Sequence, residues 1–288
     1  MIASGTHKIK LVECPRDAMQ GWKQWIPTQD KIEYINALLK VGFDTIDFGS
    51  FVNPKAIPQM ADTKEVISQL KKEGTTKLLA IIANERGATD AVVYDAIDYL
   101  GFPFSISETF QQRNTNSSIL ESLQRVESIQ KICLQHRKQL VVYISMGFGN
   151  PYGDPYTVSL VYDWINKLTG MGISIISLAD TVGLATAEQV HLICNDLITA
   201  LPEIEIGVHL HSSATNWEIK LKAAIEAGCT RFDGALGGIG GCPMANDELV
   251  GNMDSAKMIP FFQQRGYLTS LDSTALEECR RMAATIFV

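Results

Sequence analysis

Short apolar runs rich in Val, Ile and Phe alternate with longer amphipathic segments along the chain, and this alternation restricts the fold more than any other feature. The apolar runs have the length of buried strands. The amphipathic segments carry apolar residues at i, i+3 and i+4, which is the spacing of a helix with one buried face. Strands that alternate with helices pair in parallel, so we predict a parallel sheet covered by helices. The predicted strands are Ile9–Val12, Thr45–Phe48, Leu78–Ala83, Phe104–Ser107, Leu140–Ser145, Ile173–Leu178, Ile204–Leu210 and Arg231–Ala235.

The amphipathic segments between these strands predict the helices. A glycine at the end of several of them, such as Gly42 and Gly228, supplies a left-handed cap before the next strand. Eight strand–helix units match a closed (β/α)8 TIM barrel, for which about 250 residues are typical. The alternative is an open doubly wound sheet, but no G-x-G-x-x-G sequence follows the first strand, so its dinucleotide-binding form has little support. The predicted helices include 31–40, 63–72, 118–136, 158–168, 186–200 and 217–227.

We predict one α/β barrel domain over residues 1–288, with a further helix over about 270–288. The 46% hydrophobic and 20% charged residues provide for a large core. The net charge of −7, with Lys and Arg scattered along the chain, argues against a nucleic-acid partner. The first residues lack the apolar part of a secretory signal, and no apolar run approaches the roughly 20 residues that span a bilayer. We therefore expect a cytoplasmic protein with no membrane partner.

The six cysteines are far apart and include no C-x-x-C pair, which argues against a zinc ribbon or a disulfide framework. We expect most of them to be small buried side chains. Cys242 differs because it follows residues 237–241, where four of five positions are glycine. Such a segment permits lid motion, and a thiol beside a cation can transfer protons near neutral pH. The alternatives are that residues 237–241 only close the barrel tightly and that the Cys242 thiol has no function.

Polar side chains gather where the predicted strands end, which is where TIM barrels carry their active sites. Asp17 follows the first strand, Asp47 lies in the second, Asp180 follows the sixth, and His209 and His211 end the seventh. Side chains at i and i+2 of a strand point to the same face, so the two histidines can hold one cation in the barrel mouth. With the Asp17 carboxylate they form a ligand set that leaves positions open for substrate and suits Mg, Mn, Fe, Co or Zn. The alternative is that the histidines cap the strand by hydrogen bonding.

Six motifs, in the order in which they occur, resemble the 3-hydroxy-3-methylglutaryl-CoA lyases. This group belongs to the metal-dependent barrel lyases and Claisen-type synthases, which include the isopropylmalate and homocitrate synthases. The likeness extends over nearly the whole chain, and the second and last motifs resemble the lyases more than the synthases. The motifs are Pro15-Arg16-Asp17 with Gln20, residues 50–55 (SFVNPK) with 58–60 (PQM), Ser107-Glu108 with Asn114 and Asn116, residues 177–183 (SLADTVG), residues 208–211 (VHLH) and residues 238–243 (GIGGCP).

The resemblance implies a divalent cation, with Mg or Mn expected, bound by Asp17, His209, His211 and an asparagine beyond the glycine-rich loop. Asn252 is the matching asparagine, although the match requires one extra residue after the loop.

The resemblance also implies catalytic roles. Arg16 would stabilise an enolate oxygen, Cys242 would take part in proton transfer, and Asp180 would position the substrate or its base. From the residues alone, Arg16 can equally form an ion pair with its neighbour on the barrel rim, and Asp47 and Asp180 can be satisfied by loop amides. Two departures stand out: Asp47 occupies the place of a family Glu, and residues 212–215 (SSAT) replace the usual Asp-Thr-Tyr-Gly.

These observations predict a metal-dependent carbon–carbon lyase that cleaves 3-hydroxy-3-methylglutaryl-CoA into acetyl-CoA and acetoacetate. The expected partner is an acyl-CoA substrate, and a homo-oligomer is an open alternative to a monomer. A related lyase or synthase acting on another acyl-CoA or 2-oxo acid remains an alternative. A catalytically silent barrel that binds a ligand or partner is a second alternative, suggested by Asp47 and Ser212.

Overall fold

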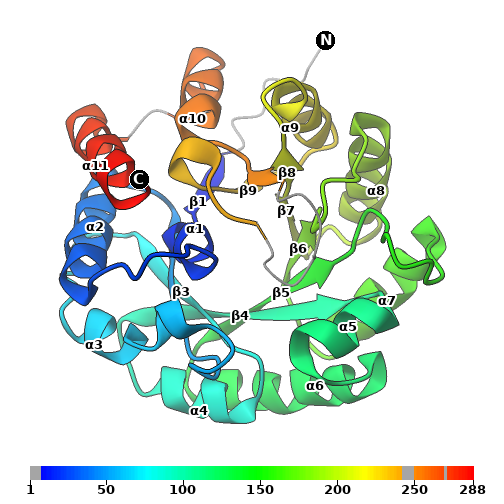
Figure 1. Cartoon of the computed structure of the whole chain (residues 1–288). Coiled ribbons are helices and arrows are strands. Elements are labelled where there is room, and N and C mark those ends of the chain that lie inside the picture. The colour runs from blue at the N-terminus through cyan, green and yellow to red at the C-terminus, as the bar shows by residue number, and fades with distance from the viewer. Residues whose placement is uncertain (1–7, 242–249, 269–270) are drawn as a thin grey trace.

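The computed structural model of the chain describes residues 8–241, 250–268 and 271–288. Eight parallel strands close into a barrel in the order β1-β2-β3-β4-β5-β6-β7-β9, so the predicted (β/α)8 TIM barrel is confirmed (Figure 1). The ring closes where β9 pairs with both β7 and β1. The barrel strands are β1 (Lys10–Glu13), β2 (Thr45–Ser50), β3 (Lys77–Ile81), β4 (Ile97–Ser105), β5 (Gln139–Ser145), β6 (Ile175–Ala179), β7 (Glu205–His209) and β9 (Arg231–Gly234).

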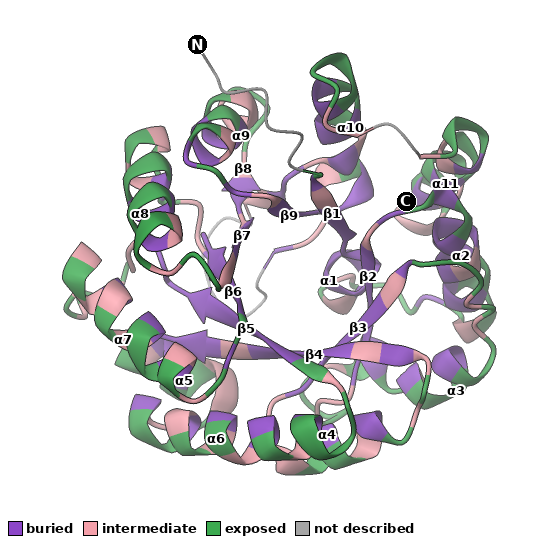
Figure 2. Ribbon diagram, turned by 180° about the vertical axis from the view of Figure 1, so that it is seen from behind, coloured by how far each residue is buried: buried purple, intermediate pink, exposed green. Residues whose placement is uncertain are grey.

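Helices surround the barrel, with buried faces toward the strands and exposed faces outward (Figure 2). The helices are α1 (Pro15–Gln20), α2 (Thr28–Val41), α3 (Thr63–Ser68), α4 (Glu85–Val92), α5 (Glu108–Thr115), α6 (Ile119–Gln135), α7 (Val158–Gly170), α8 (Ala187–Ala200), α9 (Trp217–Glu226), α10 (Ser255–Gln264) and α11 (Ser273–Ile286), with 3₁₀ turns η1 (Pro58–Met60) and η2 (Leu236–Gly238). Capping residues determine where several of these helices begin or end. Ser118 and Thr186 begin α6 and α8 with capping boxes, and Gly42 ends α2 with a φ of 90°. Among the described residues, no helix is both long and apolar enough to cross a bilayer.

The fourth strand begins earlier than the sequence predicted. β4 starts at Ile97, whereas the predicted run started at Phe104, because Gly101 and Pro103 interrupt the apolar pattern. Gly101 faces a crowded barrel interior, where an added Cβ would lie 2.5 Å from Ile81 Cδ1. The glycine therefore reflects packing across the barrel, which local propensity does not report.

The last helix, α11, packs against α2 on the outside of the barrel (Figure 1). The backbone N–H of Asp272, which precedes α11, donates to the carbonyl oxygen of Val41 at 2.9 Å. The ring of Phe287 meets those of Trp22 and Tyr34 edge-on. The C-terminal segment thus covers the first helices of the barrel.

A buried carboxyl group links the first strand to the end of the last one. Glu13 accepts hydrogen bonds from the backbone N–H of Leu236, at 2.8 Å, and from the Ser255 hydroxyl. Burial is the largest influence on this carboxyl and raises its pKa to about 8. Near neutral pH the group is therefore mostly protonated.

The Glu13 carboxyl makes stability depend on pH in a predictable direction. Its pKa rises from 4.5 in a solvated chain to about 8 in the fold, so the folded state binds the extra proton between these values. Stability therefore falls as pH rises from about 5 to about 8 and levels off above. We expect the melting temperature of Glu13→Gln to fall less over this range than that of the wild type, as measured by calorimetry. Parallel pH profiles for the two proteins would contradict this assignment.

Candidate metal and active site

Asp17 enters the barrel mouth through the short helix that follows β1. Pro15 occupies the first position of α1, where its missing N–H costs no hydrogen bond. This turn places both Arg16 and Asp17 on the wall of the pocket at the carboxyl ends of the strands. Both side chains are almost fully buried.

His209 and His211 meet Asp17 at the mouth. His209 is the last residue of β7, and His211 begins the short strand β8 (His211–Ser212). One ligand atom from each of Asp17, His209 and His211 lies within 4.8 Å of the other two. These three residues therefore lie close enough together to hold a cation. Their role as ligands stays a prediction.

Asn252 joins the same group through a small antiparallel ladder. The strand β10 (Gly251–Asn252) pairs with β8, and Asn252 lies opposite His211. The Asn252 side-chain nitrogen donates to Asp17 Oδ2 at 2.7 Å and to the Ile239 carbonyl at 2.9 Å. Asn252 therefore lies beside the Asp17 carboxylate, and its role as a fourth ligand stays a prediction.

Arg16 stands at the centre of a buried hydrogen-bond network. Its Nε donates to both carboxylate oxygens of Asp47, at 3.2 and 3.0 Å, and its Nη2 donates to Asp47 Oδ2. Its Nη1 donates to Asp17 Oδ1 at 2.9 Å and to Gln20 Oε1 at 2.8 Å. These bonds use four of the five N–H groups of a guanidinium. Within the described part of the chain, the remaining Nη2 hydrogen has no acceptor.

The protonation states of Asp17 and His211 suit cation binding. Burial tends to raise the pKa of Asp17, but Arg16 and then His209 bring it below its ordinary value. Burial, followed by the neighbouring His209, lowers the pKa of His211 to about 4. An ionised carboxylate and a neutral imidazole are the forms that bind metals. Burial tends to lower the pKa of His209, but the neighbouring Asp233 and Asp17 carboxylates outweigh it and raise this pKa above its ordinary value. A cation must therefore compete with a proton for His209.

Asp47 supports Arg16 from behind. Burial raises the pKa of Asp47 to about 6 and outweighs the opposing effect of Arg16. Asp47 is not among the residues that line the pocket, so its carboxylate meets the substrate region only through the guanidinium. The shorter side chain at this position keeps the bidentate contact. The departure from the family Glu therefore leaves the arginine held.

Asp180 also lies behind the pocket wall. Its Oδ1 accepts from the Ala185 N–H at 2.9 Å, and its Oδ2 accepts from the ammonium of Lys220 at 2.7 Å. Lys220 donates in addition to the His211 carbonyl at 2.9 Å. The neighbours Ala179 and Thr181 line the pocket, whereas Asp180 does not. This geometry fits a positioning role rather than direct proton transfer.

Removing the buried ammonium should be costly. In Lys220→Met, the Asp180 carboxylate loses its partner inside the protein, and we expect the free energy of unfolding to fall by about 3–5 kcal/mol. Lys222→Met is the matched control, because Lys222 lies on the same helix and pairs with Glu218 at the exposed surface; it should change stability little. Denaturant titrations test this, and equal stability of the two variants would contradict a buried pair.

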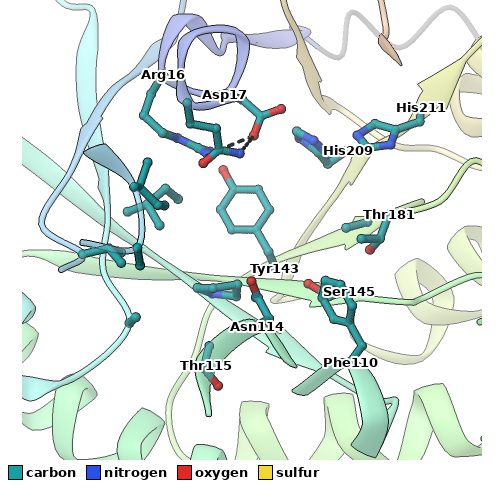
Figure 3. Close-up of a pocket in the computed structure, with 18 residues that line it drawn as sticks. Arg16, Asp17, Phe110, Asn114, Thr115, Tyr143, Ser145, Thr181, His209 and His211 are labelled. Atoms are coloured by element: carbon teal, nitrogen blue, oxygen red, sulfur yellow. Dashed lines mark hydrogen bonds and ion pairs between the residues drawn. The ribbon is translucent and has the colours of Figure 1, made fainter. Parts of the chain in front are cut away.

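Figure 3 shows the pocket between these groups. Arg16 and Asp17 lie on one side, His209 and His211 on another, and Tyr143 stands among them. Phe110, Asn114, Thr115 and Ser145 line the opposite part. One end of the pocket is thus polar and contains the three candidate cation ligands. Much of the remaining wall is apolar and includes Val52, Ala56, Ile57, Ile81, Ala83, Pro103 and Phe110.

Three side chains of this region were not predicted from the sequence. Tyr143 points into the pocket from β5, Asp233 contacts His209 from β9, and Lys220 holds Asp180 from α9. The first two lie inside predicted strands, and the inward face of those strands was the only signal that could have found them. Cys242, predicted to transfer protons, lies outside the described residues. The five other cysteines are buried and free, as the sequence predicted.

The segment after His211 differs from the family pattern but still forms an ordered connection. The Ser213 N–H donates to Asn216 Oδ1 at 2.8 Å, and α9 begins at the next residue, Trp217. The hydroxyls of Ser213 and Thr215 lie 3.1 Å apart. The replacement residues therefore supply the turn that the strand-to-helix connection needs.

A family model described as HMGL-like matches residues 8–283. The chain belongs to this family. It is 32% identical to a hydroxymethylglutaryl-CoA lyase of Bacillus subtilis over 257 residues, which cover 89% of this chain and 85% of the relative. It is also 32% identical to a 3-hydroxy-3-isohexenylglutaryl-CoA/hydroxymethylglutaryl-CoA lyase of Pseudomonas aeruginosa over 285 residues, covering 97% and 93%. The resemblance drawn from the six motifs is thereby confirmed.

Solved structures agree. An HMG-CoA lyase of Acinetobacter baumannii, in complex with coenzyme A and 3-methylmalate, superposes with a TM-score of 0.91 at 31% identity and covers 99% of this chain and 93% of that one. An HMG-CoA lyase of Brucella melitensis has a TM-score of 0.90 at 28% identity, covering 98% and 99%. The HMGL-like family and these relatives identify the chain as a carbon–carbon lyase.

Proposed function

We propose that this HMGL-like protein cleaves 3-hydroxy-3-methylglutaryl-CoA into acetyl-CoA and acetoacetate with the help of a divalent cation. The observation that carries the proposal is the convergence of Asp17, His209 and His211 beside Arg16 in one pocket. Asn252 completes the ligand set, and Mg²⁺ or Mn²⁺ is the proposed ion. When bound, such an ion polarises the substrate hydroxyl and eases loss of its proton.

We propose that Arg16 stabilises the negative charge that develops during the reaction. The free Nη2 hydrogen of Arg16 donates to the thioester oxygen, on which negative charge develops as the C2–C3 bond breaks. The two carboxylates around Arg16 hold the guanidinium in place before the reaction, and such preorganisation is what makes a donor effective. The Gln20 side chain accepts a hydrogen bond from Arg16 and donates one to Asp17 Oδ1 at 2.7 Å. This bridge fixes the guanidinium relative to the Asp17 carboxylate.

The reaction also requires that the substrate hydroxyl loses a proton and that the enolate carbon gains one. Asp180 does not line the pocket, and its two carboxylate oxygens accept hydrogen bonds from Ala185 and Lys220, so it is not placed to take a proton from the substrate. We propose that Asp180, through Lys220, positions the His211 backbone. Cys242 is the proposed donor that returns a proton to the enolate carbon, and this role rests on the family resemblance.

The apolar part of the pocket favours a second candidate substrate class. Val52, Ile57 and Ile81 line the pocket together with the polar groups, and a longer alkyl group at C3 of the substrate would bury its surface there. The Pseudomonas aeruginosa relative is named for such a substrate as well as for the methyl compound. The second candidate is therefore a lyase for 3-hydroxyglutaryl-CoA thioesters with a larger C3 substituent.

One assay tests both candidates. Chelator-treated enzyme is mixed with 3-hydroxy-3-methylglutaryl-CoA, and acetoacetate is measured before and after Mg²⁺ or Mn²⁺ is added. We expect cleavage to require the added ion. The same reaction on thioesters with longer C3 groups, followed through the common product acetyl-CoA, ranks the substrates by kcat/KM. Full activity after chelation would refute the metal-dependent mechanism, and failure to cleave any thioester would refute the lyase.

A further inference from the structure

A second group of residues that could hold a metal ion shares His209 with the first. One ligand atom from each of Cys14, His209 and Asp233 lies within 4.8 Å of the other two. Cys14 follows β1, His209 ends β7, and Asp233 lies in β9, and these strands are neighbours in the barrel. The group is thus built on three adjacent strands of the rigid barrel wall. Cys14 and Asp233 are buried.

Asp233 shows that this group has unused binding capacity. Its Oδ2 lies 3.1 Å from His209 Nδ1. Its Oδ1 is buried and has no hydrogen-bond partner among the residues that the structure describes. A carboxylate oxygen without a partner inside a protein is costly, and a bound cation would compensate it. The nearby Cys14 thiol makes a long contact of 3.9 Å with the Val12 carbonyl, which leaves its sulfur available.

We propose that Cys14 Sγ, His209 Nδ1 and the Asp233 carboxylate bind a thiophilic divalent cation such as Zn²⁺ or Cd²⁺. A sulfur, a nitrogen and an oxygen ligand suit these ions, whereas Mg²⁺ and Mn²⁺ prefer oxygen. Zinc binds sulfur at about 2.3 Å and imidazole nitrogen at about 2.0 Å, so small side-chain shifts bring all three ligands to one ion. The ion displaces the thiol proton to solvent, the His209 ring carries its remaining proton on Nε2, and a water molecule can take the fourth position.

His209 couples this second group to the first. Its Nδ1 is the ring nitrogen beside Asp233. An ion bound there leaves the ring proton on Nε2, so His209 can no longer bind a cation in the first group as a neutral ligand. A thiophilic ion would replace the hydrogen bond between His209 and Asp233. The site therefore gives this chain a place where a soft cation alters a residue of the catalytic group without occupying the same position. This inference rests on the Cys14 cluster and does not require the proposed substrate.

Cadmium titration of the full chain tests the site. Cd²⁺ is added in the presence of excess Mg²⁺, and the ultraviolet charge-transfer absorption of a cadmium–thiolate bond is recorded. We expect one equivalent of Cd²⁺ to produce the band in the wild type. Cys14→Ser should lose it, and the matched variants Cys242→Ser and Cys133→Ser should keep it. Asp233→Asn should weaken Cd²⁺ binding by at least about tenfold, which is the lower end for a group that supports a metal ligand.

Retention of the band in Cys14→Ser, or its loss in Cys242→Ser, would overturn the proposal. If Cys14→Ser does not fold, the wild type itself supplies the answer. Anomalous scattering from cadmium-soaked crystals should show an ion between Cys14, His209 and Asp233. Cadmium found only between Asp17, His209 and His211, or at neither group, would equally overturn it.

Discussion

Replacement of Arg16 by glutamine is expected to lower the kcat for acetoacetate release by about 10³-fold, at the upper end of the effect of removing one preorganised donor to a developing oxyanion. The large effect follows from the position of Arg16, which both faces the pocket and holds Asp17 and Asp47. Glutamine cannot replace the guanidinium charge or its fork of donors. Steady-state assays at saturating Mg²⁺ measure the change.

Two further variants separate a catalytic effect from a folding effect. Arg16→Lys keeps the charge but loses the bidentate contact with Asp47, so it should recover only part of the activity. Arg86→Gln changes an exposed arginine on α4 and should leave kcat unaltered. All variants are compared by circular dichroism and melting temperature. Near-wild-type turnover in folded Arg16→Gln would refute its assignment as the oxyanion donor.

The second large effect is expected from His209→Ala, which removes one of the three ligand atoms that lie within 4.8 Å of one another. Groups that only support a metal ligand typically contribute 10–100-fold to metal affinity, so loss of a ligand itself should weaken Mn²⁺ binding by at least about 100-fold. Cleavage should fall with it. Mn²⁺ affinity is measured by electron paramagnetic resonance and turnover by acetoacetate release.

His136→Ala is the matched control for this prediction. His136 follows α6 at the exposed surface, away from the barrel mouth, so its loss should change neither Mn²⁺ affinity nor kcat. Unchanged Mn²⁺ affinity in folded His209→Ala would show that the cation binds elsewhere. A loss of affinity without a loss of turnover would instead contradict the metal-dependent mechanism.

Much of the candidate site was predictable from periodicity and position. The alternation of strand residues predicted that His209 and His211 face the same way, and the position of Asp17 after the first strand predicted that it joins them. Asn252 was predictable only through the family resemblance, because its place beside His211 depends on the pairing of β10 with β8. These are pairings between segments that a local pattern does not connect.

The sequence could not predict which of the conspicuous carboxylates faces the pocket. Asp17 and Asp180 follow barrel strands and Asp47 lies within β2, but of the three only Asp17 lines the pocket. Asp47 is turned to Arg16, and Asp180 to Lys220, which lies 40 residues away along the chain. Whether a buried carboxylate meets the substrate or a structural cation depends on which partner the fold brings to it, because an unpaired charge inside the protein is too costly to persist.

By itself, the sequence determined the number and order of the barrel strands, most of the helices, and the chemical types of the residues at the barrel mouth. These properties follow from hydrophobic spacing and local capping, which act over a few residues. Only the tertiary structure decided which of those residues face the pocket, that Gly101 makes room inside the barrel, and that Cys14 and Asp233 lie beside His209. Such contacts arise when the ring of strands closes and joins residues more than 200 positions apart, such as Cys14 and Asp233.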